Sequence, residues 1–276
     1  MTIRLFIRYK GTDFNGWQVQ NRDGKPDPDA KTIQGALNDA LRELLGTELI
    51  KTVGCSRTDA GVHALEYCVS FDVEDPAVPP DRIAPALNHL LPEGIRAVRS
   101  EEAPPGFNAR RDTVKKTYVY YFYWSEDPVP VLDTGAWFIK SPLPPDVKLM
   151  RAAAAEFIGT HDFAAFSGAL DPKKDTVREI FECSAEELPP PLFMENVKLY
   201  ALTITGNGFL YNMVRIIAGT VAEAGLGKRT PENVRNVILS GKRKDAGVTA
   251  PPNGLYLARI YLGDVSGKRE ASSCKS

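Results

Sequence analysis

The sequence predicts an α+β protein with two domains, each built from an antiparallel sheet with packed helices. The first observation is the order strand, helix, strand, strand, helix, strand in the N-terminal part. The second is that the C-terminal part repeats this order with one extra helix. The third is a stretch rich in Pro and Gly between them. With 276 residues, of which 43% are hydrophobic and 25% charged, the chain can bury one or two cores.

The N-terminal part begins with a strand and a helix. Residues 3–9 alternate apolar and charged side chains, which is typical of a half-buried strand. The polar stretch 21–31 predicts an exposed loop, and Thr32 suits the N-cap of a helix that ends at Gly46. Further strands are predicted at 48–53, 65–73 and 95–98, with a short helix at 83–91 that Pro92 stops. This order is that of the split βαβ, or ferredoxin-like, unit.

The C-terminal part follows a segment without periodicity. Pro104, Pro105 and Gly106 place the domain boundary near residue 106, which gives domains of 1–106 and 107–262. Strands are predicted at 114–123, 177–184, 197–204 and 255–261, and helices at 147–158, 210–223 and 231–240. We expect a second ferredoxin-like domain, and a central active-site cleft where the two antiparallel sheets meet. The small polar residues of 263–276 predict a disordered tail.

Composition limits the classes of function. The formal net charge is −1, so the chain has no global attraction to RNA, DNA or an anionic membrane, and local basic clusters must hold any polyanion. No run approaches about 18 consecutive apolar residues, and the N-terminus lacks a signal peptide, so we expect a cytoplasmic protein. The four cysteines and three histidines lack metal-ligand spacing, so we expect reduced thiols and no metal.

One polar loop, GCSRTDAGVHA at residues 54–64, stands between two predicted strands. Loops held by rigid strands are where functional groups concentrate. Asp59, followed by Ala60 and Gly61, could be a catalytic carboxylate. It is also compatible with a simple Asx turn, with Arg57 as its surface ion-pair partner. Spacing alone leaves both interpretations open.

The nine residues SRTDAGVHA (56–64) closely resemble the signature of the TruA family of tRNA pseudouridine synthases. Further segments that resemble this family follow in its order: DFNGWQ (13–18), FNAR (107–110), KTYVY (116–120), GTHDF (159–163) with FS (166–167), GFLYNMVR (208–215) and APPNGLYL (250–257). The resemblance covers residues 3 to 262. It implies that Asp59 is the catalytic nucleophile. The loop at 21–31 is longer than is usual in bacterial members, which affects the RNA path near the first helix.

The chemistry of such an enzyme suits a carboxylate. Conversion of uridine to pseudouridine is an isomerisation, so it requires no redox cofactor, metal or external nucleophile, and we expect no cofactor. A carboxylate can attack C1′ or C6, or promote a glycal intermediate, and the sequence leaves these open. In a closed pocket it needs a cation to stay ionised. The resemblance assigns that cation to Arg215, which could otherwise be a charge extending from an amphipathic helix into water.

Other site residues also come from the resemblance. Tyr118 corresponds to the tyrosine that packs against the target base, although an aromatic strand is also compatible with simple sheet packing. Arg57 belongs with the RNA backbone and the flipped base, and Leu255 with the apolar wall that excludes water. Basic residues expected to bind RNA, each equally compatible with a solvated face, are Arg110, Arg111, Lys115, Lys116, Lys173, Lys174, Lys228, Arg229 and the run 242–244.

The resemblance further implies a homodimer that acts on the anticodon stem-loop of tRNA, at positions 38, 39 and 40. We expect tRNA as the partner, and neither DNA nor a membrane. One alternative is a related synthase with a different tRNA site. Another is a catalytically idle RNA-binding protein on the same scaffold, against which the presence of Asp59, Tyr118 and Arg215 argues. A metal or nucleotide enzyme is remote, because the sequence contains no ligand cluster, P-loop or GxGxxG motif.

Overall fold

The structure, a computed structural model, describes residues 1–22, 24–27, 29–169, 175–191 and 194–263. By its internal contacts the chain divides into two compact units. The first consists of Met1–Ala60, Ala64–Val114 and the chain from Arg259 on, and the second of Gly61–His63 and Lys115–Ala258. Compactness does not show that either unit folds alone, so the domain limits 1–106 and 107–262 stay a prediction. The predicted tail at 263–276 lies, beyond Gly263, outside the described residues.

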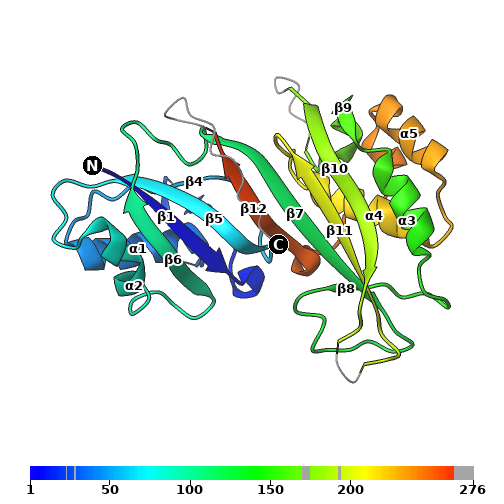
Figure 1. Cartoon of the computed structure of the whole chain (residues 1–276), viewed down its shortest axis with the longest axis horizontal. Coiled ribbons are helices and arrows are strands. Elements are labelled where there is room, and N and C mark those ends of the chain that lie inside the picture. Colours follow the sequence, from blue (N-terminus) through cyan, green and yellow to red (C-terminus); the bar gives the residue numbers. More distant parts are fainter. Residues whose placement is uncertain (23, 28, 170–174, 192–193, 264–276) are drawn as a thin grey trace, which may run out of the picture. The chain divides into compact units, whose positions relative to one another are not determined.

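In the first unit the strand order is β6-β1-β5-β12, the last by its residues from Arg259 on, and β4 also pairs with β5 (Figure 1). The pairs β1–β5, β1–β6 and β4–β5 are antiparallel. The elements are β1 (Thr2–Tyr9), β4 (Val53–Gly54), β5 (His63–Asp72), β6 (Ile95–Glu102), β12 (Leu255–Leu262), α1 (Ile33–Leu45) and α2 (Ile83–Leu87).

The predicted strand and helix at the start of the chain are confirmed, because their apolar positions form one core. Ile3, Leu5 and Ile7 of β1 are fully buried. Thr32 caps α1, with its hydroxyl accepting a hydrogen bond from the Gly35 amide at 3.1 Å. The helix ends at Gly46, whose φ of 63° is the left-handed conformation that glycine adopts readily.

Several predicted limits in this unit are wrong. The strand expected at 48–53 is reduced to β4, because Leu49 is exposed and only the last residues reach β5. The loop at 21–31 contains a short hairpin of β2 (Asn21–Arg22) and β3 (Lys25–Pro26). The Arg22 guanidinium braces it through carboxylates of Asp27 and Asp29, both at 2.9 Å. Helix α2 is shorter than predicted, and β6 is longer because it pairs with β1 along nearly its whole length.

In the second unit the strand order is β12-β7-β11-β10-β9, with Leu255–Ala258 of β12, and β8 pairs parallel with β7. The pairs β7–β11, β10–β11 and β9–β10 are antiparallel. Figure 1 shows α3, α4 and α5 together on the same side of β10 and β11. The elements are β7 (Thr113–Trp124), β8 (Trp137–Phe138), β9 (Gly159–Asp162), β10 (Val177–Leu188), β11 (Lys198–Gly206), α3 (Val147–Ala155), α4 (Met213–Gly225) and α5 (Pro231–Ser240).

Some helix ends in this unit are marked by local sequence signals, and others are not. Helix α5 matches its predicted limits, because Thr230 caps it and Pro231 occupies its first position. Helix α4 begins at Met213 and not at residue 210, because Asn212 has a φ of 59° and cannot be helical. The predicted helix at 147–158 ends at Ala155, and strands β8 and β9 were not predicted because they are only 2 and 4 residues long.

The result is a mixed α/β protein with five α-helices among the described residues. Short 3-10 helices are formed by Gly11–Asp13, Pro80–Arg82, Ala164–Phe166, Arg243–Asp245 and Pro252–Gly254. Within those same residues, every helix is too short or too polar to pass through a membrane.

Candidate active site

The loop that contains Asp59 joins β4 to β5 and alternates buried and accessible residues. Ser56 and Thr58 are buried, whereas Arg57 is exposed and Asp59 is partly exposed. The backbone of the loop is therefore packed against the protein while its two charged side chains reach the surface. This arrangement combines a fixed frame with accessible functional groups.

Contacts from the N-terminal segment hold the residue before Asp59. The Thr58 carbonyl accepts a hydrogen bond from the Trp17 amide at 3.1 Å. The Thr58 hydroxyl is hydrogen bonded to the hydroxyl of Tyr9, at the end of β1, at 2.8 Å. The Tyr67 hydroxyl donates to the Ser56 carbonyl. Both the backbone and the side chain of the residue preceding Asp59 are thus fixed.

Gly16 explains why the DFNGWQ segment belongs to this site. Its φ is +92°, and a Cβ there would lie 2.8 Å from the Thr58 carbonyl oxygen and 3.2 Å from the Asp59 carbonyl carbon. Only glycine allows this approach without moving the loop. The next residue, Trp17, packs its ring on Tyr67 with centroids 4.3 Å apart. Tyr67 in turn is hydrogen bonded to the loop at Ser56.

The chain immediately after Asp59 is fixed by the APPNGL segment. The His63 ring is hydrogen bonded through Nε2 to the Asn253 carbonyl at 3.1 Å, and it stacks on Tyr256 with centroids 4.5 Å apart. The Asn253 side-chain amide in turn donates to the carbonyls of Asp133 and Ala136, at 2.7 and 3.0 Å. Asp59 therefore lies between two anchored stretches of chain.

Arg215 lies in the first turn of α4, and its guanidinium is held by the protein. Nε donates to the Ala250 carbonyl at 2.7 Å, and one terminal nitrogen donates to the Asn212 side-chain carbonyl at 2.9 Å. The Ala250 amide donates back to the Arg215 carbonyl at 3.1 Å. These contacts argue against the interpretation of Arg215 as a charge that merely extends into water.

The APPNGL segment also contacts the aromatic strand β7. The Tyr120 hydroxyl donates to the Pro251 carbonyl at 2.7 Å, and burial raises the pKa of Tyr120 well above its usual value, against the opposing effect of the nearby Arg215 charge. Tyr118 is buried on the same face of the strand, with its ring edge-on to Phe209 at a centroid distance of 5.2 Å. Leu255 is buried at the start of β12. The second unit thus brings Arg215 and the aromatic face of β7 together.

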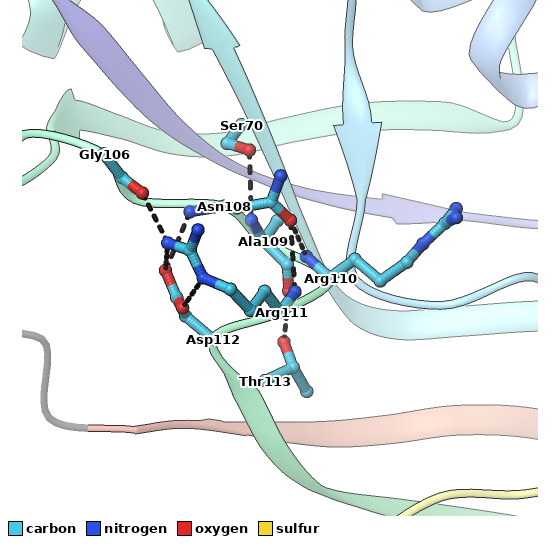
Figure 2. Close-up of polar contacts among 8 residues, drawn as sticks. All are labelled: Ser70, Gly106, Asn108, Ala109, Arg110, Arg111, Asp112 and Thr113. Carbon is cyan, nitrogen blue, oxygen red and sulfur yellow. Dashed lines mark hydrogen bonds and ion pairs between the residues drawn. The ribbon is translucent and has the colours of Figure 1, made fainter.

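In the loop after β6, two neighbouring arginines differ in what they contact (Figure 2). The Arg111 guanidinium binds the Asp112 carboxylate at 2.8 Å and the Gly106 carbonyl at 2.5 Å, and it lowers the pKa of Asp112. The Asn108 side chain accepts from the amides of both arginines at 3.1 Å. Arg110 is exposed, and Figure 2 shows its side chain extending away from this network. Arg111 is thus engaged within this loop, whereas Arg110 extends away from it.

Other basic residues predicted to bind RNA divide in the same way. Arg229 pairs with Glu223, and Arg243 donates to the Gly247 carbonyl and the Thr249 hydroxyl, both at 2.9 Å. Lys116 is partly exposed at the start of β7, and the neighbouring Lys115 ammonium lies over the Phe181 ring at 5.8 Å. Lys173 and Lys174 lie outside the described residues.

Several positioning residues were not predicted from the sequence, namely Tyr9, Thr58, Asn212, His63 and Asn253. Four of them stand inside segments that resemble the family, so the motifs indicated their importance but not their contacts. In the part of the chain that the structure describes, no group of His, Cys, Asp or Glu could hold a metal ion. Cys55, Cys68 and Cys183 are buried, and none of these three is in a disulfide.

The chain is similar in sequence to known tRNA pseudouridine synthases. The family model described as tRNA pseudouridine synthase matches residues 5–110 and 153–261. The tRNA pseudouridine synthase A of Bacillus subtilis is 40% identical over 262 residues, covering 95% of this chain and 99% of that protein. The proteins of the same name from Acetivibrio thermocellus and Geotalea uraniireducens are each 39% identical over 259 residues, covering 94% of this chain and 98% of theirs. The chain therefore belongs to the TruA family of tRNA pseudouridine synthases.

Proposed function

We propose that this protein isomerises uridine to pseudouridine in the anticodon stem-loop of tRNA, at positions 38, 39 and 40, with Asp59 as the catalytic carboxylate. Membership of the family makes the chain an isomerase that acts on uridine in tRNA. The stem-loop positions, a homodimeric state and a cytoplasmic location complete the proposal. The first two rest on the resemblance alone, and the location rests on the sequence features described above.

The Asp59 loop supports this proposal most strongly. The residues on both sides of Asp59 are held by hydrogen bonds and ring contacts, and its own side chain is partly exposed. A carboxylate on such a fixed backbone can meet a bound nucleotide without first being ordered, which lowers the entropic part of the barrier. A simple Asx turn would not need anchors from three separate segments of the chain.

The reaction balances without a further reactant. The bond between N1 and C1′ breaks, the base turns, a bond forms between C5 and C1′, and the proton on C5 is replaced by one on N1. Asp59 would act on C1′ or C6, or assist a glycal intermediate. Water must be kept from the detached sugar, because its attack would leave an abasic site.

Further roles follow from the second unit. Arg215 would keep the carboxylate ionised, and its contacts with Ala250 and Asn212 hold the guanidinium in one orientation. Tyr118 would pack against the target base, and Leu255 would form part of the apolar wall. Arg57, Arg110 and Lys116 would bind the RNA, and the exposure of Arg57 and Arg110 supports this role.

The finer fold assignment belongs to the same proposal. We assign two ferredoxin-like domains whose antiparallel sheets meet at the active-site cleft. The order β6-β1-β5 with α1 and α2 in the first unit supports the first domain, and β7, β10 and β11 with α3 and α4 support the second.

The proposal is tested by incubating the protein with unmodified tRNA transcripts and mapping pseudouridine by carbodiimide-dependent primer extension. Wild type should modify positions 38, 39 and 40, and Asp59→Asn should bind tRNA normally and form no detectable pseudouridine. Asp81→Asn, which alters an exposed carboxylate beside α2, is the matched control and should be fully active. Modification elsewhere would favour a related synthase, and an inactive wild type would favour the idle scaffold.

A further inference from the structure

One face of the sheet in the first unit contains four arginines that none of the roles above uses. We infer that this surface, the arginine face, binds phosphates of the RNA substrate outside the active site. The inference rests on the proposed function, because it takes tRNA as the ligand. The arginine face consists of Arg4 and Arg8 of β1 and Arg96 and Arg99 of β6.

Alternation along β1 places two arginines on this face. Ile3, Leu5 and Ile7 are fully buried in the core shared with the helices, so the residues between them point to the opposite side of the sheet. Arg8 is exposed there, and Arg4 is partly exposed. Four residues of extended chain separate these two arginines by about 13 Å, a span sufficient for more than one phosphate.

A bulge in β6 adds two more arginines to the same side. Phe6 pairs with Arg99, Ile7 with Ala97 and Arg8 with Arg96, so Val98 is the extra residue. Without this bulge Arg96 and Arg99, three positions apart, would point to opposite faces. Ala97 instead faces the helices, where its carbonyl accepts a hydrogen bond from Asn88 at 2.9 Å.

The guanidinium groups of this face lie over aromatic rings. Arg99 stacks on Phe6 with its Cζ 3.5 Å from the ring centroid, and Arg4 lies 5.8 Å from the same ring and 5.5 Å from that of Phe107. Arg4 also binds the Glu101 carboxylate at 3.0 Å. A guanidinium stacked on a ring keeps its N–H groups pointing outward in its own plane, where they can bind phosphate.

Arg8, Arg96 and Arg99 have no carboxylate partner among the described residues. The Arg8 Nε donates to the Leu65 carbonyl at 3.0 Å, and its terminal nitrogens are not used by that bond. Two acidic residues of the neighbouring β5 keep their charge, but their hydrogen bonds come from neutral donors and not from these arginines. Asp72 accepts from the Thr2 hydroxyl at 2.6 Å, and Glu66 from the Ile260 amide at 3.0 Å.

The loop shown in Figure 2 extends this positive surface. Ser70 pairs with Arg4 across the two strands, and its hydroxyl accepts a hydrogen bond from the Ala109 amide at 3.0 Å. The loop therefore crosses the side of the sheet that holds the arginine face. It presents Arg110, which is exposed and was already predicted to bind RNA.

Charge complementarity selects a polyanion as the occupant. The chain has a net charge of −1, so such a concentration of arginines is not a general property of its surface. The corresponding side chains of β10 in the second unit are acidic, since Glu182 and Glu186 are exposed where Cys183 and Ala185 are buried. RNA phosphates would bind the first surface and be repelled from the second.

The test measures single-turnover pseudouridine formation against enzyme concentration at several salt concentrations. Arg96→Gln combined with Arg99→Gln should raise the enzyme concentration at half-saturation about tenfold and leave the saturating rate unchanged. The slope of log affinity against log salt should fall by about 0.7 to 0.9 for each phosphate that the variant no longer binds. Arg82→Gln removes one positive charge, half the change made by the double variant, from an exposed arginine beside α2, and it should change neither quantity.

Two further variants separate binding from folding. Arg96→Gln alone removes no hydrogen bond or ion pair that the structure shows, so its folding should match wild type while its salt slope falls by the amount expected for about one phosphate. Arg99→Lys keeps the charge but loses the planar stack, so it should retain the slope and part of the affinity.

The possible outcomes distinguish failure of this inference from failure of the proposed function. Unchanged affinity and slope in the double variant would overturn the inference, and so would a change in sedimentation without a change in tRNA binding, because the face would then contact a second copy. A wild type that forms no pseudouridine would overturn the proposed function. In that case direct tRNA binding, weakened by the double variant and not by Arg82→Gln, would still support the arginine face.

Discussion

The protein surrounds Asp59 in the first unit and Arg215 in the second with different kinds of contact. Around Asp59, hydrogen bonds fix Ser56 and Thr58, and the functional side chain projects from a fixed backbone. At Arg215, the hydrogen bonds reach the guanidinium itself, from Ala250 and Asn212. On the proposed roles both arrangements are useful, because a fixed loop backbone directs the carboxylate at the substrate, and a cation that supplies charge works best when its orientation is fixed.

Removal of the fixed cation should give the largest effect. We expect Arg215→Ala to lower the single-turnover rate by about 100-fold or more, because a carboxylate enclosed with its substrate loses the charge that keeps it ionised. Arg215→Lys should recover only part of the rate, since it lacks the planar fork. Both rates are measured at saturating enzyme with unmodified tRNA.

Arg243→Ala is the matched control for Arg215→Ala. It also removes a guanidinium that donates to a backbone carbonyl of the second unit. It should leave the saturating rate within about twofold of wild type. Equal losses in both variants would show that folding of this unit, and not the charge of Arg215, is responsible.

Displacement of the Asp59 backbone should give the next largest effect. Gly16→Ala places a methyl group 2.8 Å from the Thr58 carbonyl oxygen at a φ of +92°. We expect a loss of about 1 to 3 kcal/mol in unfolding free energy and a rate about tenfold or more below wild type. Urea unfolding and single-turnover kinetics measure the two quantities.

Gly46→Ala separates backbone strain from loop displacement. It has a φ of +63° but nothing within 4 Å of the added methyl group. It should lose stability and keep the saturating rate. If Gly46→Ala slowed catalysis as much as Gly16→Ala, general destabilisation would explain both, and the fixed backbone around Asp59 would have no specific role.

Loosening the guanidinium should give a smaller effect. Asn212→Gly removes the 2.9 Å bond to Arg215 and suits the φ of 59° at this position, so stability should change little. The bond to Ala250 remains, and we expect the saturating rate to fall only about fivefold, which corresponds to about 1 kcal/mol. Asn212→Ala should show the same rate and an added loss of stability. A rate that does not change would show that the bond to Asn212 is not needed to orient Arg215.

Local signals explain what the sequence predicted well. Thr32 and Gly46 mark the ends of α1, and Thr230 and Pro231 mark the start of α5, because caps act within one turn of the helix. The predicted strand at 48–53 was wrong in its limits, because pairing with β5, not apolar content, decides where β4 begins.

For the site, the motif around Asp59 was sufficient to suggest its role. The contacts that hold the residues around Asp59 could not be predicted from the sequence. The contact between Tyr9 and Thr58 spans 49 positions, and that between His63 and Asn253 spans 190. The start of α4 was also missed, because a left-handed Asn212 has no signature in its residue type alone. Contacts over such separations depend on the folded chain and not on local pattern.

The smallest effect should be a loss of stability in alkaline solution. In the second unit, burial and the hydrogen bond to Asp133 raise the pKa of Tyr123 to about 12, and burial raises the pKa of Tyr200 to about 12. From pH 10 upward the unfolded chain loses these protons before the folded chain does, so stability falls between pH 10 and 12. We expect a loss on the order of 1 kcal/mol by about pH 11. Urea unfolding at about pH 9 and about pH 11 measures it, and Tyr123→Phe should reduce the difference between the two. Hydrogen exchange at the higher pH should accelerate around β7 and β8, and unchanged exchange there would contradict this assignment.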